Sequence, residues 1–177
     1  MDRVLPIVTE LASRRPERTV FTRFIPPERA TDAPGMWQHY YTRWRIATRE
    51  QLDPALLELL PPLAKLCPPG TTINKTRYSA FAEPQLLQHL QGREADGLIV
   101  SGSETDVCVL STVLGAVDLG YRVIVVRDAV CSSSDEGHDA LMTLYQQRYT
   151  EQIEVADLRP SSSAGSHSGG RRLPDLH

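Results

Sequence analysis

The alternation of hydrophobic and polar residues divides the first half of the chain into short elements. Apolar residues recur at helical spacing in residues 3–14, which predicts an amphipathic helix. Residues 19–24, TVFTRF, are β-branched and aromatic and end before two prolines, so they predict a strand. In residues 37–44, WQHYYTRW, aromatic side chains fall at i, i+3, i+4 and i+7, on one face of a short helix. The leucines in residues 56–63 predict a further helix, bounded by Pro54 and broken by the two prolines near its end.

The second half alternates more regularly between strands and helices. The predicted order is strand, helix, strand, helix, strand, over residues 97–102, 106–119, 122–128, 135–148 and 152–157. Gly120 follows the first of these helices as a C′ residue, and Ser134 precedes the second as an N-cap. The middle strand, RVIVVRD, is nearly continuous in apolar residues, as expected for a strand buried on both faces. This order predicts an α/β fold with three layers, in which helices flank a parallel sheet.

Length and composition narrow the class of protein further. The 177 residues fit one domain, over residues 1–158, and the Ser-, Gly- and Pro-rich residues 159–177 are predicted to be a disordered tail. The formal net charge is −3 without a basic or acidic block, which argues against a nucleic-acid partner. No apolar run approaches the roughly 20 residues that cross a membrane, and no signal peptide is apparent. The three cysteines lack metal-site spacing and fit a reduced, cytoplasmic protein.

Residues 101–111, SGSETDVCVLS, place a cysteine where a predicted strand passes into a helix. Open parallel sheets bind ligands in such loops, beyond the carboxyl ends of their strands. With Thr105 as the N-cap, Cys108 lies in the first helical turn, where free N–H groups and the helix dipole favour a thiolate. The same N–H groups could hold an oxyanion. Packing is the alternative, because free cysteine often acts as a small buried hydrophobe; for Cys67 and Cys131 that structural interpretation is the better one.

Two segments resemble the signatures of the isochorismatase-like cysteine hydrolases. Residues 97–141 contain a strand ending in Gly, then x-x-Thr-Asp-x-Cys-Val, a helix, and a second strand ending in Asp-Ala. Residues 74–81, NKTRYSAF, resemble the family's lysine followed by Tyr-Ser-Ala-Phe. The resemblance extends over residues 3–157. It implies a hydrolase that cleaves the C–N bond of a small amide, carbamoyl or ureido substrate through a cysteine thioester, without a cofactor.

The resemblance also implies roles for individual residues. Cys108 matches the nucleophile, and Lys75 matches the cation that stands beside it in the family. The backbone N–H groups of Glu104 and Cys108 match the oxyanion hole, and the Ser103–Glu104 peptide bond is expected to be cis. A solvated surface lysine is the alternative for Lys75.

A third catalytic residue implied by the resemblance has no match in this sequence. In the family, an aspartate follows a first strand as Asp-x-Gln, moves the thiol proton to the leaving group, and lies at the end of a central strand. Residues 1–11 match the helix after that strand, and Asp2 has no apolar strand before it. Three explanations stand: the first methionine lies inside a longer reading frame, the chain is a truncated copy, or a second subunit fills the gap. The intact motifs favour the first, and the chain as it stands is expected to be weakly active or inactive.

Metal binding is not expected. Metal-binding nicotinamidases of the family carry Asp-x-His and a later histidine, whereas the matching interval here holds only His39. His89 and His138 are expected to be solvated on helix surfaces. Candidate substrate contacts are Arg23, Trp37, Tyr41, Tyr78 and Phe81. For the aromatic residues at 37–44 a core or dimer face is the alternative, and for Arg23 a structural role is.

Other functions remain as alternatives to the amidohydrolase. Vinyl ether hydrolysis of the isochorismatase type needs no cysteine at this position, so Cys108 favours the amidase branch. A catalytically impaired or non-catalytic member that binds a metabolite or a partner subunit is the alternative from another class. A nucleotide-binding Rossmann domain lacks support, because no Gly-x-Gly-x-x-Gly follows a predicted strand. The expected partners are a small-molecule substrate and further copies of the chain, as a dimer or tetramer, with no nucleic acid and no membrane.

Overall fold

The computed structural model describes residues 3–159 and 171–172, and the chain divides into two compact units. The first unit combines the N-terminal residues up to Arg15 with those from Tyr78 onward. The second unit comprises Pro16–Arg77. The single domain over residues 1–158 that length and composition predict is not tested by this division and stays a prediction.

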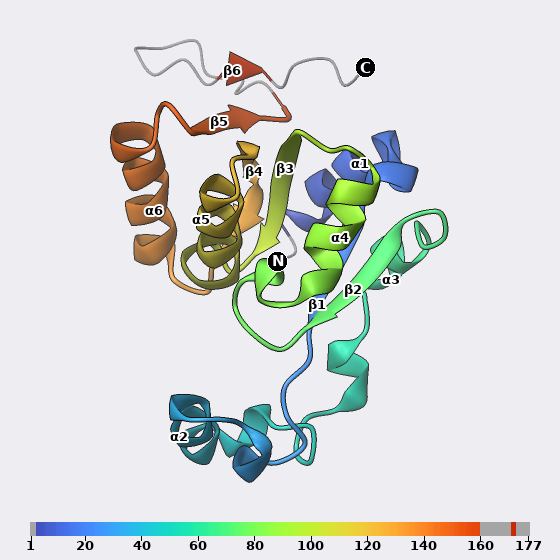
Figure 1. Cartoon of the computed structure of the whole chain (residues 1–177), viewed down its shortest axis with the longest axis vertical. Helices are drawn as coiled ribbons and strands as arrows, with labels where there is room; N and C mark the ends of the chain where they lie inside the picture. The colour runs from blue at the N-terminus through green and yellow to red at the C-terminus, as the bar shows by residue number, and fades with distance from the viewer. Residues whose placement is uncertain (1–2, 160–170, 173–177) are drawn as a thin grey trace. The chain divides into compact units, whose positions relative to one another are not determined.

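The first unit is built on a four-stranded sheet in the order β3-β4-β5-β6, in which each neighbouring pair is parallel (Figure 1). Its helices and strands are α1 (Leu5–Arg14), α4 (Pro84–Gly92), β3 (Gly97–Ser103), α5 (Leu110–Asp118), β4 (Arg122–Cys131), α6 (Asp135–Arg148), β5 (Ile153–Asp157) and β6 (Arg171–Arg172). The predicted strand–helix–strand–helix–strand order, and with it the α/β fold, is confirmed. Strand β6 falls within the predicted disordered tail, residues 159–177, most of which lies outside the described residues.

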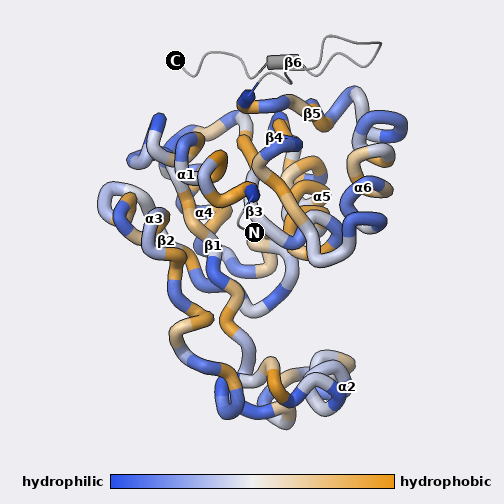
Figure 2. The backbone as a smooth tube through the Cα atoms, turned by 180° about the vertical axis from the view of Figure 1, so that it is seen from behind, coloured by the Kyte–Doolittle hydropathy of each residue, from blue (hydrophilic) through white to orange (hydrophobic). Residues whose placement is uncertain are grey.

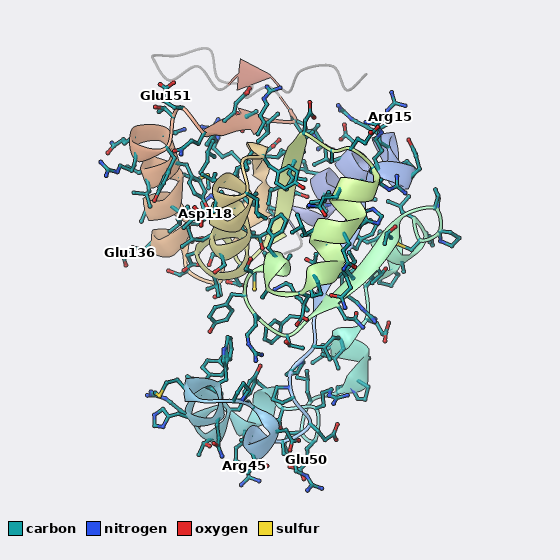
Figure 3. The ribbon with its side chains drawn as sticks, viewed as in Figure 1. Arg15, Arg45, Glu50, Asp118, Glu136 and Glu151 are labelled. Carbon is teal, nitrogen blue, oxygen red and sulfur yellow. The ribbon has the colours of Figure 1, made fainter. Side chains whose placement is uncertain are left out.

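Helices cover both faces of this sheet. Helix α5 packs against β4 and α6 against β4 and β5, whereas α1 packs against β3 and β4 from the opposite face (Figures 1 and 2). The hydrophobic segments gather in the strands and α5, while α6 alternates between hydrophobic and hydrophilic residues (Figure 2). Val113, Val123, Val125 and Tyr145 are 0% exposed in the core between these elements. The outer side of α6 is polar, and Glu136 near its start and Glu151 just beyond its end point outward (Figure 3).

The ends of α5 and α6 follow the predicted capping chemistry. Gly120 has φ +83° after α5, its N–H donates to the carbonyl of Val117, and the Tyr121 N–H donates to the carbonyl of Ala116. These two bonds form a Schellman motif, which requires a left-handed residue and so favours glycine. Ser134 accepts a hydrogen bond from the Gly137 N–H at 3.0 Å and caps α6 as predicted.

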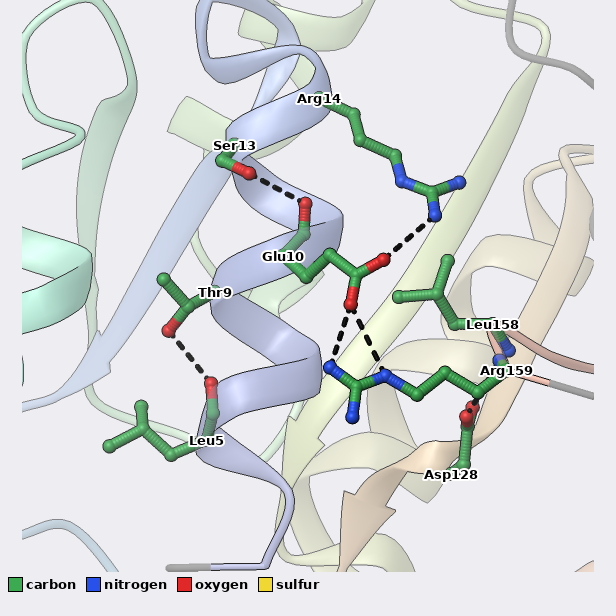
Figure 4. A network of polar contacts seen from close by, with 8 residues as sticks. All are labelled: Leu5, Thr9, Glu10, Ser13, Arg14, Asp128, Leu158 and Arg159. Carbon is green, nitrogen blue, oxygen red and sulfur yellow. Dashed lines mark hydrogen bonds and ion pairs between the residues drawn. The ribbon is translucent and has the colours of Figure 1, made fainter.

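Helix α1 is tied to β4 and to the residues that follow β5 by a polar network (Figure 4). The Asp128 carboxylate accepts hydrogen bonds from the backbone N–H groups of Leu158 and Arg159 at 2.9 and 3.0 Å. The Arg159 side chain in turn donates to Glu10 of α1 at 2.8 Å, and Arg14 donates to the same carboxylate at 3.0 Å. These charge-assisted contacts lower the pKa of the Glu10 carboxyl below its ordinary value, the hydrogen bond from Arg159 contributing most.

The second unit contains a two-stranded parallel sheet. Strands β1 (Val20–Phe24) and β2 (Thr71–Lys75) pair in register, so that Phe24 is opposite Lys75. The strand at residues 19–24 was predicted, but β2 was not, because TTINK buries only Ile73 and Lys75 and shows little hydrophobic character. Helix α2 (Met36–Arg43) matches the predicted aromatic helix.

The leucine-rich segment of the second unit differs from its prediction. It forms two single turns, a 3-10 turn at Pro54–Leu57 and α3 (Pro61–Ala64), instead of one helix over residues 56–63. Pro61 and Pro62 begin the second turn rather than break the first. Proline is favoured at the start of a helix because its φ is preset and its missing N–H is not needed there.

Each sheet ends in a strand that is paired along one edge alone among the described residues. Among the residues that the structure describes, β1 pairs only with β2, and β3 pairs only with β4. The central strand that the sequence analysis expects to be missing is not tested by this arrangement and stays a prediction.

Candidate active site

The carboxyl end of β3 departs from regular strand geometry immediately before the cysteine turn. The pairing of β3 with β4 shifts register between Val100 and Gly102, and Gly102 has φ +111°. The following peptide bond, Ser103–Glu104, is cis, at the position where the family resemblance implies one. The strand ends at Ser103, and a helical turn begins two residues later, at Thr105.

Cys108 lies on a single π-helical turn, Thr105–Val109, that leads directly into α5. Its thiol is free of disulfide bonding and half-buried. The Val109 N–H donates to the carbonyl of Glu104 at 3.0 Å, which makes Glu104 the N-cap residue. The prediction that Thr105 is the N-cap is therefore wrong, although Cys108 does lie in the first turn after the strand. Of the candidate oxyanion donors, Glu104 thus immediately precedes the turn and Cys108 lies within it.

Thr105 does not cap the turn because its hydroxyl has another partner. The side chain is 0% exposed, and Oγ1 lies 3.0 Å from Nδ1 of His138 on α6. A buried hydroxyl without a partner is costly, so the imidazole satisfies a polar group that the turn would otherwise leave unpaired. His138 is half-buried rather than solvated, which corrects the sequence prediction for this residue.

The residues on either side of Thr105, Glu104 and Asp106, are held by the loop between β4 and α6. Glu104 accepts hydrogen bonds from the Ser133 N–H at 2.6 Å and from the Ser132 hydroxyl at 3.0 Å. The Ser132 hydroxyl also lies 2.5 Å from Oδ1 of Asp106. A Cβ atom added at Gly137 would clash with the Asp106 carboxylate, so glycine permits this close approach. The turn that carries the cysteine is therefore fixed by tertiary contacts as well as by its own backbone.

The Glu104 carboxylate is stabilised in its ionised form. Burial raises the pKa of this carboxyl, but the hydrogen bonds from the backbone and side chain of Ser133 and from Ser132 lower it. The net result is a pKa below the ordinary value of 4.5. The carboxylate thus acts as an acceptor that fixes the loop.

The YSAF segment packs along the helix that follows Cys108. The Ala80 N–H donates to Oγ1 of Thr112 at 3.1 Å, one turn beyond the cysteine. A Cβ atom on Gly115 would lie 3.2 Å from the Ser79 hydroxyl and 3.3 Å from the Phe81 ring, so glycine allows a tight fit between helix and segment. These contacts join the two sequence signatures of the chain within the first unit.

The structure shows packing contacts for Phe81, whereas for Tyr78 it shows partial burial. Phe81 packs against the hydrophobic core, with its ring stacked on that of Tyr121 at 6.2 Å. This contact gives Phe81 a packing role. Tyr78 is half-buried at the start of the same segment.

Lys75 is buried at the end of β2 in the second unit, with 4% of its surface exposed. Its ammonium donates to the carbonyl of Arg77 at 3.0 Å and lies 5.1 Å above the ring of Phe24. The alternative of a solvated surface lysine is therefore wrong. Burying an ammonium group is expensive and is seldom tolerated without compensating contacts, which makes the position a candidate for chemistry. Lys75 belongs to the second unit and Cys108 to the first.

Arg23 is engaged in contacts within the second unit. Its guanidinium donates to Glu58 at 2.7 Å and to the side-chain oxygen of Asn74 at 3.0 Å. These bonds link β1 to β2 and to the loop before α3. The structural alternative raised for Arg23 is therefore the one that the contacts support.

The aromatic residues of α2 pack largely against one another. Tyr41 is 2% exposed, and its ring stacks on that of Trp37 with centroids 6.0 Å apart. The Tyr40 ring meets the Tyr41 ring edge-on at 5.1 Å, and the Arg77 guanidinium lies 5.4 Å above Trp37. Trp44, predicted to share this face, is 49% exposed. Packing thus accounts for Tyr41. Trp37 contacts both this aromatic cluster and Arg77, which lies two residues after Lys75.

The described residues offer no candidate metal centre. Within residues 3–159 and 171–172, no three His, Cys, Asp or Glu side chains are arranged to hold an ion. Across the same residues, no helix combines the length and apolar character needed to span a bilayer. The absence of a metal stays a prediction.

His138 is the site residue that sequence reasoning missed. The predicted N-cap at Ser134 was the available signal, because it places His138 in the first turn of α6, at the carboxyl edge of the sheet. The cysteine loop also leaves that edge. Sequence alone does not show which way the imidazole points.

Curated proteins match part of the chain. Over 66 residues, covering 37% of this chain and 36% of the relative, the chain is 44% identical to an uncharacterized isochorismatase family protein of Bacillus subtilis (strain 168). Over 69 residues, 38% of this chain and 35% of the relative, it is 39% identical to a probable inactive nicotinamidase of Arabidopsis thaliana. The matched segments therefore span little more than a third of these curated relatives.

A solved structure and a family model extend the match to nearly the whole chain. The structure of a cysteine hydrolase from Pseudomonas syringae pv. phaseolicola 1448A superposes with a TM-score of 0.71 at 26% identity, covering 88% of this chain and 76% of that one. The isochorismatase domain model matches residues 4–157. The chain therefore belongs to the isochorismatase domain family.

Proposed function

We propose that this protein is a cysteine hydrolase that cleaves the C–N bond of a small amide, carbamoyl or ureido compound. The observation that carries the proposal is the setting of Cys108. Its free, half-buried thiol stands on the first turn after β3, at the carboxyl edge of a parallel sheet. Peptide N–H groups at the start of a helix favour a thiolate and can hold a developing oxyanion.

The proposed reaction has two steps. The Cys108 thiolate attacks the carbonyl carbon, the C–N bond breaks, and the amine or ammonia leaves with a proton, giving a thioester on the enzyme. Water then attacks the thioester, the C–S bond breaks, and the carboxylic acid and the thiol are released. The N–H groups of Glu104 and Cys108 serve as the oxyanion hole in both steps, and Lys75 supplies the cation that the family resemblance implies.

Proton delivery is the step for which the sequence has no matching residue. An amine is a poor leaving group unless it is protonated, so the aspartate implied by the resemblance would supply that proton. The sequence contains no Asp-x-Gln after an apolar strand. We infer that residues 1–177 by themselves form a thioester readily with substrates whose leaving group needs no proton, and slowly with amides.

A catalytically impaired member that binds a metabolite is the second candidate function. The likeness to a relative described as a probable inactive nicotinamidase favours it. Amide turnover distinguishes the two candidates, because an impaired member would keep a thiol that reacts yet release no ammonia.

Other expectations belong to the same proposal. We expect a cytoplasmic protein that acts as a dimer or tetramer on a small-molecule substrate without a cofactor. Multi-angle light scattering of the purified chain measures the oligomeric state directly, and a monomer at all concentrations would contradict that part of the proposal.

Acylation by p-nitrophenyl acetate tests the nucleophile without requiring an acid. The Cys108 thiolate displaces p-nitrophenolate, an acetyl group is attached to sulfur, and water later releases acetate. We expect a burst of p-nitrophenolate and an acetylated Cys108 peptide by mass spectrometry. Cys108→Ser should abolish both signals, whereas the matched variant Cys131→Ser should keep them. Equal acetylation of Cys108 and Cys131 would contradict the proposal.

A further inference from the structure

We propose that His138 is a positioning residue that sets the geometry of the cysteine turn through the hydroxyl of Thr105. The proposal rests on the function proposed for Cys108 and extends it to a residue on a different helix. His138 is remote from the nucleophile in sequence and acts on it through an intermediary. The interaction is the Thr105–His138 contact of 3.0 Å between the turn and α6.

The first argument is the burial of the hydroxyl. Thr105 is 0% exposed, so its Oγ1 has no access to solvent, and an unsatisfied hydroxyl there would cost free energy. Threonine can satisfy itself on a helix by bonding to its own backbone. Here the imidazole of His138 takes that role, which fixes the χ1 rotamer of the residue three positions before Cys108.

The second argument is the irregular geometry of the turn itself. A single π-helical turn has no repeating pattern of hydrogen bonds to hold it, and such turns often occur at functional sites. Its shape must come from contacts outside the turn. The loop between β4 and α6 supplies such contacts at Glu104 and Asp106, and His138 of α6 supplies one at Thr105 between them.

The third argument concerns which of these contacts can tune the cysteine. The contacts of Ser132 and Ser133 with Glu104 hold the chain at the cis peptide bond, before the turn begins. Thr105 is the first residue of the turn, so its contact with His138 acts on the turn itself, as does the contact of Ser132 with Asp106. His138 therefore fixes the buried first residue of the cysteine turn, and with it the direction in which the turn leaves the sheet.

The test measures the rate at which iodoacetamide alkylates Cys108 at about pH 6, where thiolate content limits the reaction. Peptide mass spectrometry separates Cys108 from Cys67 and Cys131. We expect His138→Leu and Thr105→Val each to slow alkylation by about tenfold, the effect of losing one well-placed hydrogen bond. The double variant should be no slower than the slower single variant, because both remove the same contact.

Rescue by conservative variants separates positioning from bulk stability. Asn places a polar atom near the position of Nδ1, so His138→Asn should react within about twofold of the wild type, as should Thr105→Ser. His89→Leu on α4 and Thr143→Val on α6 are matched controls elsewhere in the first unit and should leave the rate unchanged. Urea unfolding of every variant reports its stability independently of the alkylation rate.

Each outcome decides between the two proposals. A fast wild-type rate that is unchanged in His138→Leu would overturn the role of His138 and leave the nucleophile intact. Equal slowing in His138→Leu and His138→Asn, or single effects that multiply in the double variant, would also overturn it. A wild-type Cys108 that reacts no faster than N-acetylcysteine would overturn the proposed nucleophile and the role of His138 together.

Discussion

The hydroxyl oxygen of Thr105 lies 3.0 Å from Nδ1 of His138, and the two residues are 33 positions apart in the sequence. This contact joins the turn after β3 to the helix after β4. Neighbouring parallel strands bring their carboxyl ends to one edge of the sheet, so two separate loops can build one site. The cysteine turn is shaped by the second loop as much as by its own sequence.

The buried ammonium of Lys75 gives the first prediction. Lys75→Met removes the charge but keeps much of the apolar stem. The family resemblance pairs this lysine with the nucleophile, and a cation beside a thiol favours the thiolate, so we expect the variant to slow alkylation of Cys108 at about pH 6 by roughly tenfold or more. Lys65→Met, at an exposed position of the same unit, is the matched control and should react as the wild type does. Identical rates for both variants would show that Lys75 does not act on the cysteine.

The Glu104 carboxylate predicts a dependence of stability on acid. Its pKa is lowered in the folded protein, so the ionised form stabilises the fold above the ordinary value of 4.5, and this stabilisation is lost as the pH falls through the folded pKa. Between about pH 6 and pH 3, we expect the free energy of unfolding to fall less in Glu104→Gln than in the wild type, as measured by urea unfolding. The control is Glu151→Gln, at an outward-pointing position (Figure 3). An unchanged pH profile for Glu104→Gln would contradict this account of the loop.

Tyr145 presents an unusual buried hydroxyl. The side chain is 0% exposed in the core, and its hydroxyl has no hydrogen-bond partner among the described residues. Burial raises the pKa of this phenol well above its ordinary value. Because removing an unsatisfied polar atom relieves its desolvation cost, Tyr145→Phe should leave the free energy of unfolding unchanged or raise it by up to about 1–2 kcal/mol.

The control for Tyr145→Phe removes the ring as well. Tyr145→Ala leaves a large cavity in the core and should cost about 3–5 kcal/mol. A loss of more than about 1 kcal/mol in Tyr145→Phe would indicate a hydrogen bond to the hydroxyl, in contradiction to the structure.

The Schellman motif at the end of α5 predicts different outcomes for two glycines. Gly120→Ala places a Cβ atom on a residue with φ +83° and should lower the free energy of unfolding by about 1–2 kcal/mol. Gly92, the last residue of α4, has open space around an added Cβ, and Gly92→Ala should be neutral or slightly stabilising. Urea unfolding of both variants measures the difference, and equal effects would argue against the left-handed cap.

Local chemistry accounts for what the sequence predicts correctly. Ser134 and Gly120 act on backbone groups within four residues of themselves, so their roles as caps follow from sequence alone. The apolar run of β4 is likewise sufficient to predict a buried strand. The position of Cys108 in a first turn follows from the strand that precedes it.

The failures lie where distant residues decide the structure. Thr105 is predicted to cap the turn, but its hydroxyl contacts the imidazole of His138 on another helix instead. Lys75 lies in a polar-looking strand, and its burial depends on Phe24 and on the pairing of β1 with β2. The leucines at 56–63 have helical spacing, yet the prolines allow only single turns. Spacing along the chain does not carry this tertiary information.

The most direct measurement is the rate of Cys108 alkylation by iodoacetamide as a function of pH. If the sulfur is ionised at the start of the helix, its rate at about pH 6 will exceed that of N-acetylcysteine by roughly tenfold or more and will change little up to about pH 8. A rate that rises in parallel with that of N-acetylcysteine over the same range would contradict the activated nucleophile on which the proposed function depends.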